Sequence, residues 1–180
     1  HNVLNATAAL AVSLNLGIKI KIIKNVFKKF KGIQRRFTKI FSHKGKDFYD
    51  DYAHHPTEIT SLLKGARSAY PNRKIISVFQ PHRYSRVSSL LNEFSKCFKL
   101  SNKVVLCPVY SAGEKKRKNF NLFKFAKLIG KRSNVQVIII KNENELLKYL
   151  QKNLYFDELV ICMGAGSISA WIRDIVKDLK

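Results

Sequence analysis

Apolar residues recur at helical spacing through the first part of the chain. They do so over residues 3–16, up to Gly17, and again over residues 18–30, before Gly32. Spacings of three and four residues place them on one face of a helix, and a glycine just after the last periodic position is a common helix end. The pattern predicts two amphipathic helices joined by a short turn.

The pattern then changes to two short runs separated by a turn. Residues 37–41 and 46–50 are short runs that mix aromatic, apolar and polar side chains, and a Lys-Gly pair at 44–45 lies between them. Two short runs of this kind around a glycine-containing turn are typical of a β-hairpin. We therefore expect a domain boundary before the hairpin, with one domain in residues 1–33 and a second in residues 34–180.

Apolar strands and amphipathic helices alternate through the remainder of the chain. Nearly continuous apolar strands, each followed by a helix, are typical of a parallel sheet with helices on both faces. The expected fold class is α/β, with a Rossmann-like, mostly parallel sheet that follows the two helices and the hairpin. The expected elements are helix 56–69, strand 74–80, helix 86–100, strand 103–107, helix 121–130, strand 134–140, helix 143–153, strand 158–162 and helix 167–179.

Composition and charge narrow the classes of function. With 180 residues, 46% of them hydrophobic, the chain can bury a sizeable core. Its 34 Lys and Arg residues against 12 Asp and Glu residues give a formal net charge of +22, which would suit nucleic acid. The lysines are spread through every segment and form no single stripe, so we expect no nucleic-acid partner. A basic nucleic-acid-binding domain remains the alternative.

The cysteines and the apolar start indicate a cytoplasmic protein. Cys97, Cys107 and Cys162 are far apart in sequence and show neither a disulfide framework nor a zinc spacing. The alanine-rich residues 6–16 are too few and too polar to span a bilayer. We therefore expect a soluble protein without a membrane partner. Because the chain begins with His1, we also expect it to be a piece of a longer polypeptide.

Reactive side chains are concentrated where the second hairpin strand passes into a helix, in DDYAHHPTE (residues 50–58). Pro56 is a favoured first helical residue, and strand-to-helix turns are where open α/β sheets bind ligands. Asp51 can accept hydrogen bonds from ribose hydroxyls, and Tyr52 and His54 are expected to project beyond the strand. The aspartates and histidines could also ligate a metal, but adjacent histidines point in different directions, so we assign no metal ligand.

A second segment of the same kind follows the next strand. FQPHRYSR (residues 79–86) ends that strand and contains His82, Arg83 and Arg86. The two arginines are three residues apart at the start of a helix, where backbone N–H groups also favour an anion. We expect this cationic pair to hold a carboxylate or a phosphate, and surface charge without a ligand is the alternative.

Three further segments carry weaker signals. Asn2 and Asn5 share one helix face and could read the edge of a purine or simply cap the helix. Arg36, in an arginine pair before the hairpin, could clamp a phosphate or lie in solvent. The glycine turn at residues 164–166 could cradle a phosphate, although close packing of strand and helix is the preferred interpretation.

Together these segments resemble the Mur ligases of peptidoglycan synthesis. The strings DDYAHHPTE and FQPHRYSR, followed in order by YSAGE and MGAGS, carry the resemblance, which covers essentially the whole chain. It implies that residues 1–33 are the C-terminal end of a central ATPase domain and that residues 34–180 are the C-terminal Rossmann-like domain. It also implies ATP and Mg²⁺ as cofactors of an amide-forming ligase that works through an acyl phosphate. The pattern is most similar to members that join L-alanine to UDP-N-acetylmuramate.

The resemblance also implies roles for individual residues. Asn2 and Asn5 match asparagines near the adenine. Arg36 matches an arginine that faces the nucleotide phosphates, and Asp51 matches a ribose-binding aspartate. The positions that match the amino-acid and muramoyl side of the site are Tyr52, His54, His82, Arg83 and Arg86. Of these, the arginines are expected to hold carboxylate or phosphate oxygens, Tyr52 and His54 to position the nucleophile, and the candidate catalytic residues are His54, Arg83 and Arg86.

Parts of the family pattern do not occur in these 180 residues. The sequence contains no G-x-x-G-K-[ST] phosphate loop, nor the metal-binding Glu and His of the central domain, nor a UDP-binding N-terminal domain. We therefore expect the Mg²⁺ ligands in those missing domains, which are the expected partners of this chain, and expect the chain alone to be inactive. Murein peptide ligase, which attaches a tripeptide to the same nucleotide sugar, is the alternative within the family.

Overall fold

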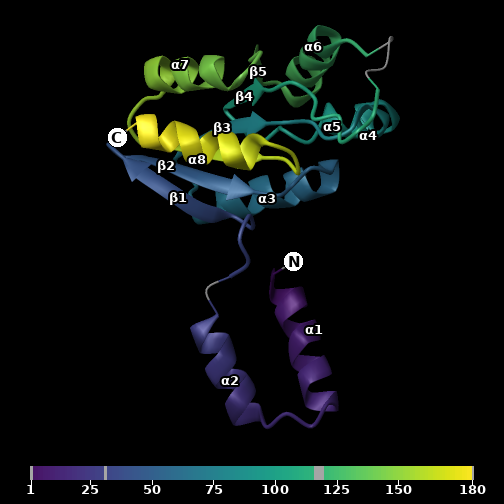
Figure 1. Ribbon diagram of the computed structural model, residues 1–180, viewed down its shortest axis with the longest axis vertical. Helices are drawn as coiled ribbons and strands as arrows, with labels where there is room; N and C mark the ends of the chain where they lie inside the picture. The colour runs from purple at the N-terminus through teal and green to yellow at the C-terminus, as the bar shows by residue number, and fades with distance from the viewer. Residues whose placement is uncertain (1, 31, 116–119, 180) are drawn as a thin grey trace. The chain divides into compact units, whose positions relative to one another are not determined.

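The computed structural model describes residues 2–30, 32–115 and 120–179 (Figure 1), so His1 lies outside the described residues. The chain divides into two compact units, His1–Ile33 and Gln34–Lys180. The predicted assignment of the first unit to the end of a larger ATPase domain stays a prediction.

The first unit contains two helices, α1 (Asn2–Asn15) and α2 (Ile20–Lys29), which confirms the two helices predicted there. Between them Gly17 has a φ of 74°, a conformation that residues with a Cβ rarely adopt, so the glycine allows α1 to end. A membrane crossing would need a longer and more apolar helix than any in the described part of the chain.

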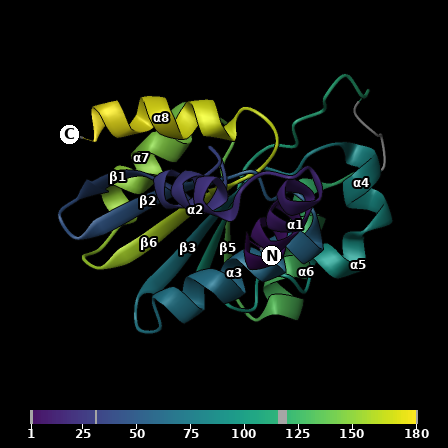
Figure 2. The ribbon, with the colours of Figure 1, turned by 90° about the horizontal axis from the view of Figure 1, so that it is seen from below.

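The second unit is built on a six-stranded sheet with the strand order β1-β2-β6-β3-β4-β5. Its neighbouring strands run parallel except β1 and β2, which form the predicted antiparallel hairpin. Figure 2 shows β6 between β2 and β3. The strands are β1 (Thr38–His43), β2 (Lys46–Asp51), β3 (Lys74–Phe79), β4 (Lys103–Leu106), β5 (Gln136–Ile139) and β6 (Glu158–Met163).

The hairpin turn has the backbone geometry that a two-residue connection requires. Lys44 and Gly45 both have positive φ, 48° and 75°. Turns of this type twist in the same sense as the paired strands, which is why they favour glycine at the second position. The turn therefore sets the register, with Lys46 opposite His43.

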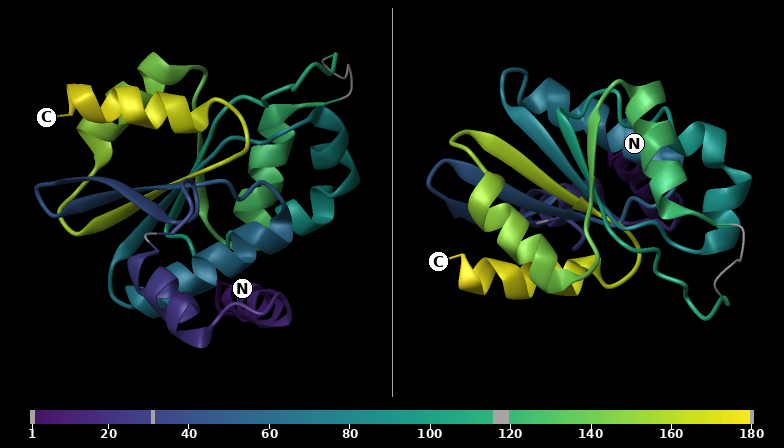
Figure 3. Two further views of the ribbon diagram at one scale, coloured as in Figure 1. Left: turned by 60° about the horizontal axis from the view of Figure 1, so that its bottom comes forward. Right: turned by 90° about the horizontal axis from the view of Figure 1, so that it is seen from above.

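Helices cover both faces of the sheet, which confirms the predicted α/β fold. Those that follow β2, β3 and β4 pack on one face, and α7 and α8 pack on the other (Figure 3). Right-handed crossovers have this result, because the chain moves along the sheet to β5 and then reverses direction to insert β6. The helices are α3 (Pro56–Ala69), α4 (Tyr84–Ser89), α5 (Leu91–Phe94), α6 (Leu122–Ser133), α7 (Glu143–Asn153) and α8 (Ile168–Asp178).

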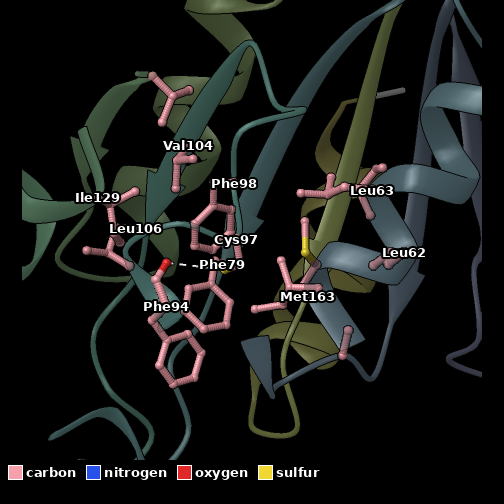
Figure 4. Close-up of a cluster of buried hydrophobic side chains, with 14 of the residues drawn as sticks. Leu62, Leu63, Phe79, Phe94, Cys97, Phe98, Val104, Leu106, Ile129 and Met163 are labelled. Carbon is pink, nitrogen blue, oxygen red and sulfur yellow. Dashed lines mark hydrogen bonds between the residues drawn. The ribbon is translucent and has the colours of Figure 1, made fainter. Parts of the chain in front are cut away.

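The larger of two apolar cores anchors the strand end that carries part of the candidate site. Phe79, the last residue of β3, has its ring centroid 5.7 Å from that of Phe94 and 5.3 Å from that of Phe98 (Figure 4). The nearby Cys97 thiol donates a hydrogen bond to the Phe94 carbonyl oxygen at 3.2 Å. Full burial of each such ring stabilises the fold by about 2 kcal/mol, so the end of β3 is firmly held.

The single helix predicted over residues 86–100 is wrong, because two short helices and a run of turns take its place. Leu90, between α4 and α5, leaves helical geometry with φ −114° and ψ 27°. Just before it, the Ser88 and Ser89 hydroxyls donate to backbone carbonyl oxygens four and three residues earlier. Such side-chain bonds compete only weakly with the backbone ladder of a helix, since α1 and α3 contain them and remain unbroken, so the helix ends at the backbone of Leu90.

Candidate functional site

Three turns lie side by side at the carboxyl edge of the parallel strands, after β2, β6 and β3. The Gly164 N–H donates to the Asp51 carbonyl oxygen at 3.2 Å, and the Gln80 N–H donates to the Met163 carbonyl oxygen at 3.0 Å. These bonds continue the strand pairing into the turns. In an open α/β sheet this edge is where ligands bind.

Asp51 shapes the turn after β2. One of its carboxylate oxygens accepts from the Phe37 N–H and the other from the Ala53 N–H, both at 2.7 Å. Only 5% of the residue is exposed, and this burial raises the pKa of its carboxyl, an effect that the two backbone bonds only partly offset. Each oxygen keeps a second lone pair, and the predicted contact with a ribose hydroxyl would use one of these.

Tyr52 lies over two guanidinium groups. Its ring centroid is 4.6 Å from Arg35 Cζ and 5.9 Å from Arg36 Cζ, within the range of cation–π contacts. Arg35 is half-buried, and its Nη2 donates to the Gly164 carbonyl oxygen at 2.6 Å. Arg36, which was predicted to face phosphates, is exposed. Arg35 therefore ties two of the turns together, while Arg36 keeps its charge in solvent.

Asp50 is a fully buried carboxylate beside this contact. Its Oδ2 accepts from Ser169 Oγ at 2.5 Å and lies 3.5 Å from Arg173 Nη2, and its Oδ1 is 4.0 Å from Arg35 Nε. Sequence reasoning gave neither Asp50 nor Arg35 a role, because the sequence does not show that a charged side chain is buried and paired inside the fold. In the structure these two hold the framework of the site.

His54 is held by its neighbours on the same turn. Its Nδ1 is 2.9 Å from the Tyr52 carbonyl oxygen and 3.4 Å from Glu58 Oε2. Glu58 also accepts from the backbone N–H groups of His54 and His55, at 3.0 and 3.1 Å. Together with the His55 side chain it forms the capping box that starts α3. The two adjacent histidines thus differ, because His55 caps the helix while His54 contacts Tyr52.

Arg83 and Arg86 take different positions after β3. Arg83 is exposed, and its backbone N–H donates to the Tyr110 carbonyl oxygen at 2.8 Å. Its φ of 68° is rare for a residue with a Cβ and costs about 1–3 kcal/mol, a kind of strain that concentrates at functional sites. Arg86 is half-buried, with its Nη1 3.1 Å from His82 Nδ1. One arginine thus reaches solvent while the other contacts an imidazole.

Four aromatic rings form a continuous row, with three of them in the turns after β2 and β3 and the fourth, Tyr110, in the loop after β4. The His82 ring stacks on Tyr110 with centroids 5.5 Å apart and meets His54 edge-on at 5.7 Å, and His54 meets Tyr52 at 5.2 Å. Burial lowers the pKa of His82, and the Arg86 guanidinium lowers it further. The surroundings of His82 therefore favour its neutral form. We call Tyr52, His54, His82 and Tyr110 the ring row.

Glu114 occupies the start of α4, where we expected an anion to bind. Its carboxylate accepts from the Ser85 hydroxyl and, at 3.0 Å, from the Ser85 N–H, and these bonds lower its pKa. The protein's own carboxylate is thus already paired with this helix end, and a substrate anion would meet the arginine side chains instead. Sequence reasoning missed this contact, because the two residues are 29 positions apart.

The glycine turn after β6 fits close packing, as the sequence analysis preferred. A Cβ on Gly164 would lie 2.8 Å from the Gln80 carbonyl oxygen, and one on Gly166 would lie 2.5 Å from both Gln80 Oε1 and Tyr110 Cγ. Gln80 Oε1 also accepts from the Ile168 N–H at 3.0 Å. Both glycines therefore allow the turn to lie directly against the turn after β3.

The second unit brings most of the predicted site residues to this one edge, namely Arg36, Asp51, Tyr52, His54, His82, Arg83 and Arg86. Asn2 is the first residue of α1 in the first unit, and Asn5 lies exposed on the same helix, so their adenine contact stays a prediction. Within the described residues, no group of three or more His, Cys, Asp or Glu side chains is arranged to hold a metal ion.

The mostly parallel six-stranded α/β fold matches that of Mur ligase C-terminal domains. Residues 35–166 match the family described as Mur ligase, glutamate ligase domain. The chain belongs to the Mur ligase family.

Several curated relatives of the chain are named as alanine ligases. The chain is 49% identical over 97% of its length to UDP-N-acetylmuramate--L-alanine ligase of Pelagibacter ubique (strain HTCC1062), and 40% identical over 99% to that of Paramagnetospirillum magneticum. The matches cover 38% and 37% of those proteins, so the chain spans little more than a third of their length.

Two solved structures of ligases are also similar to the chain. UDP-N-acetylmuramate-alanine ligase MurC from Thermotoga maritima superposes with a TM-score of 0.80 and 29% identity, covering 99% of this chain and 37% of that one. A murein peptide ligase from Psychrobacter arcticus superposes with a TM-score of 0.73 over the same shares of both chains. The latter is only 20% identical, so it shows the shared fold alone.

Proposed function

We propose that this chain is the C-terminal part of an ATP-dependent ligase that joins L-alanine to UDP-N-acetylmuramate in the cytoplasm, a step of peptidoglycan synthesis. The observation that carries the proposal is the 49% identity to an L-alanine ligase over 97% of the chain. The geometry supports it, because arginine, histidine and tyrosine side chains suited to a small zwitterion meet at the carboxyl edge of the sheet.

The proposed reaction has two steps. ATP transfers its terminal phosphoryl group to the muramoyl carboxylate, which gives an acyl phosphate and ADP. The amino group of L-alanine then attacks the acyl carbon, so that a C–N bond forms while the C–O bond to phosphate breaks and phosphate leaves with that electron pair. The amine loses one proton in this step. Such a site works chiefly by positioning the reactants and stabilising negative charge.

The ring row and the two arginines would serve the amino acid. Arg83, with its exposed guanidinium, and Arg86 would hold carboxylate or phosphate oxygens, for which planar guanidinium groups are well suited. Tyr52 would position the amine, and His54 would accept its proton. His82 lies beside His54 and completes this side of the site.

Other residues would bind the nucleotide. The exposed Arg36 would face the phosphates of ATP, Asp51 would accept from a ribose hydroxyl, and Asn2 and Asn5 would lie near the adenine. Mg²⁺, when bound, would neutralise phosphate charge, and we assign its ligands to the remainder of the ligase. Since the chain corresponds to 38% of the Pelagibacter ubique relative, we propose that it ligates only together with the equivalent of that remainder.

A chimeric ligase tests this function. Residues 1–180 are joined to the unmatched remainder of the Pelagibacter ubique ligase, and ADP release that requires both UDP-N-acetylmuramate and L-alanine is measured. We expect turnover by the chimera and none by residues 1–180 alone. In the chimera, Arg83→Ala should lower kcat/KM by about 100-fold, the order found when one donor to a developing negative charge is removed, with an unchanged circular dichroism spectrum.

The matched control is Arg132→Ala, which removes an exposed arginine near the end of α6 and should leave the kinetics unchanged. Equal rates for Arg83→Ala and the unmodified chimera would disprove the role of Arg83. A substrate panel separates the alternative, because a chimera that joined the tripeptide of murein recycling faster than L-alanine would be a murein peptide ligase.

A further inference from the structure

His54 has a contact that fixes the position of its ring proton. Its Nδ1 lies 2.9 Å from the Tyr52 carbonyl oxygen. A carbonyl oxygen only accepts hydrogen bonds, so Nδ1 must carry the hydrogen. The Glu58 carboxylate, 3.4 Å from the same nitrogen, is also an acceptor and favours the same position. In the neutral His54 ring, Nε2 therefore keeps its lone pair.

His82 has the opposite arrangement. Arg86 Nη1 lies 3.1 Å from His82 Nδ1. A guanidinium only donates hydrogen bonds, so this Nδ1 accepts, and the neutral ring carries its proton on Nε2. The two neighbouring imidazoles, whose centroids are 5.7 Å apart, thus differ in polarity, because Nε2 is an acceptor in His54 and a donor in His82.

Glu58 does more in this arrangement than a helix cap requires. Glutamine serves as well as glutamate at the third helical position of a capping box. Burial raises the pKa of Glu58, but the backbone bond from His54 and the charge of its imidazole outweigh this effect and lower the pKa overall. Glu58 is therefore ionised at neutral pH, and its negative charge lies beside the N–H side of the His54 ring.

We propose that Glu58 and Arg86 are positioning residues that give the site one imidazole acceptor, His54 Nε2, and one imidazole donor, His82 Nε2–H. The chemical use of this pair rests on the proposed function. As the C–N bond forms, the acceptor takes the proton that the amine loses, while the donor binds a carboxylate or phosphate oxygen. An amino acid presents both kinds of group within a few ångströms, which matches the closeness of the two rings.

NMR of the imidazole nitrogens in the 180-residue chain tests the proton positions directly. The spectra are recorded at about pH 8.5, roughly two units above the ordinary histidine pKa of about 6.5. We expect His54 as the Nδ1–H tautomer and His82 as the Nε2–H tautomer. A wild-type chain in which His54 carries its proton on Nε2 would overturn the inference.

Three variants identify what sets the tautomers. Glu58→Gln keeps the cap but removes the charge, and should raise the Nε2–H fraction of His54 while leaving His82 unchanged. Arg86→Ala should raise the Nδ1–H fraction of His82 and leave His54 unchanged. Glu145→Gln is the matched control, because Glu145 has the same capping position on α7 and accepts from the Lys141 N–H at 2.7 Å. An equal response of His54 to Glu58→Gln and Glu145→Gln would refute the role of Glu58.

Kinetics of the chimeric ligase separate this inference from the proposed function. Glu58→Gln should lower kcat by about 10-fold or more, a part of what a general base contributes, with little change in the KM for L-alanine and a shifted pH profile. Glu145→Gln should change none of these. An inactive chimera whose histidines show the expected tautomers would count against the ligase alone, whereas an active chimera with reversed tautomers would count against the inference alone.

Discussion

Gly164→Ala should destabilise the second unit more than most single substitutions do. Gly164 has a φ of 151°, where side-chain-bearing residues are rare, and a Cβ there would lie 2.8 Å from the Gln80 carbonyl oxygen and 3.1 Å from Ile168 Cγ2. The carbonyl oxygen of the same glycine accepts from Arg35 Nη2. A shift of this residue would therefore also disturb the contact that ties two turns of the site together.

The expected loss in the free energy of unfolding is the sum of two costs. A disallowed backbone conformation costs about 1–3 kcal/mol, and forcing an extra carbon against backbone atoms costs about 1–3 kcal/mol more. A total of about 4 kcal/mol is a large part of the roughly 5–15 kcal/mol by which domains are stable. With a urea dependence of about 2 kcal/mol per molar, the unfolding midpoint should fall by about 2 M.

Urea unfolding followed by far-UV circular dichroism measures this change, with Gly65→Ala as the control of opposite sign. Gly65 lies exposed within α3, and a Cβ there would meet nothing within 4 Å. Alanine is a better helix residue than glycine by about 0.5–1 kcal/mol, so this variant should raise the midpoint slightly. A Gly164→Ala midpoint equal to that of the wild type would refute the close-packing argument.

Two further predictions concern charge and thiols. Asp47 accepts hydrogen bonds from the side chains of Lys39, Ser42 and Arg73, which outweigh the effect of burial and lower its pKa to about 2. Because the carboxyl pKa is lowered on folding, ionised Asp47 stabilises the fold above the unfolded pKa of 3.8, and this stabilisation is lost as the pH falls through about 2. Asp47→Asn should therefore lower the stability at pH 7 and reduce the loss of stability between about pH 4 and 2. Urea titrations in which the variant keeps the pH dependence of the wild type would contradict this. Burial raises the pKa of the thiols of Cys97, Cys107 and Cys162. A thiol-specific reagent should therefore label the chain in urea but not the folded chain. Rapid labelling of the folded chain at any of the three would contradict this prediction.

Elements with strong local signals were predicted from the sequence to the residue. Helix 56–69 coincides with α3, because a proline at the first position and a capping glutamate at the third define its start. The hairpin turn was predicted from one glycine after a lysine. The single helix over residues 86–100 was wrong, because the break at Leu90, where φ is −114°, leaves no mark on the apolar periodicity of the segment.

The sequence predicted only part of the site. The motifs that follow β2 and β3 were expected at one edge of the sheet, because the carboxyl ends of parallel strands meet there. The sequence could not show which member of an adjacent pair turns inward. Arg35 is half-buried with a φ of 58°, whereas Arg36 is exposed, and a linear pattern reveals neither. The contact between Glu114 and Ser85 was equally hidden, because it depends on how two loops meet in three dimensions.

The place of β6 in the sheet also decides when the site comes into existence. The ribosome must synthesise the chain as far as Met163 before the strand that joins β2 to β3 is present. Until then the hairpin and the β3–β5 part have no strand between them, and each leaves an open edge of unpaired backbone groups. The turns that carry Tyr52 and His82 belong to separate pieces during that time. A nascent chain thus completes its ring row only after β6 has been synthesised.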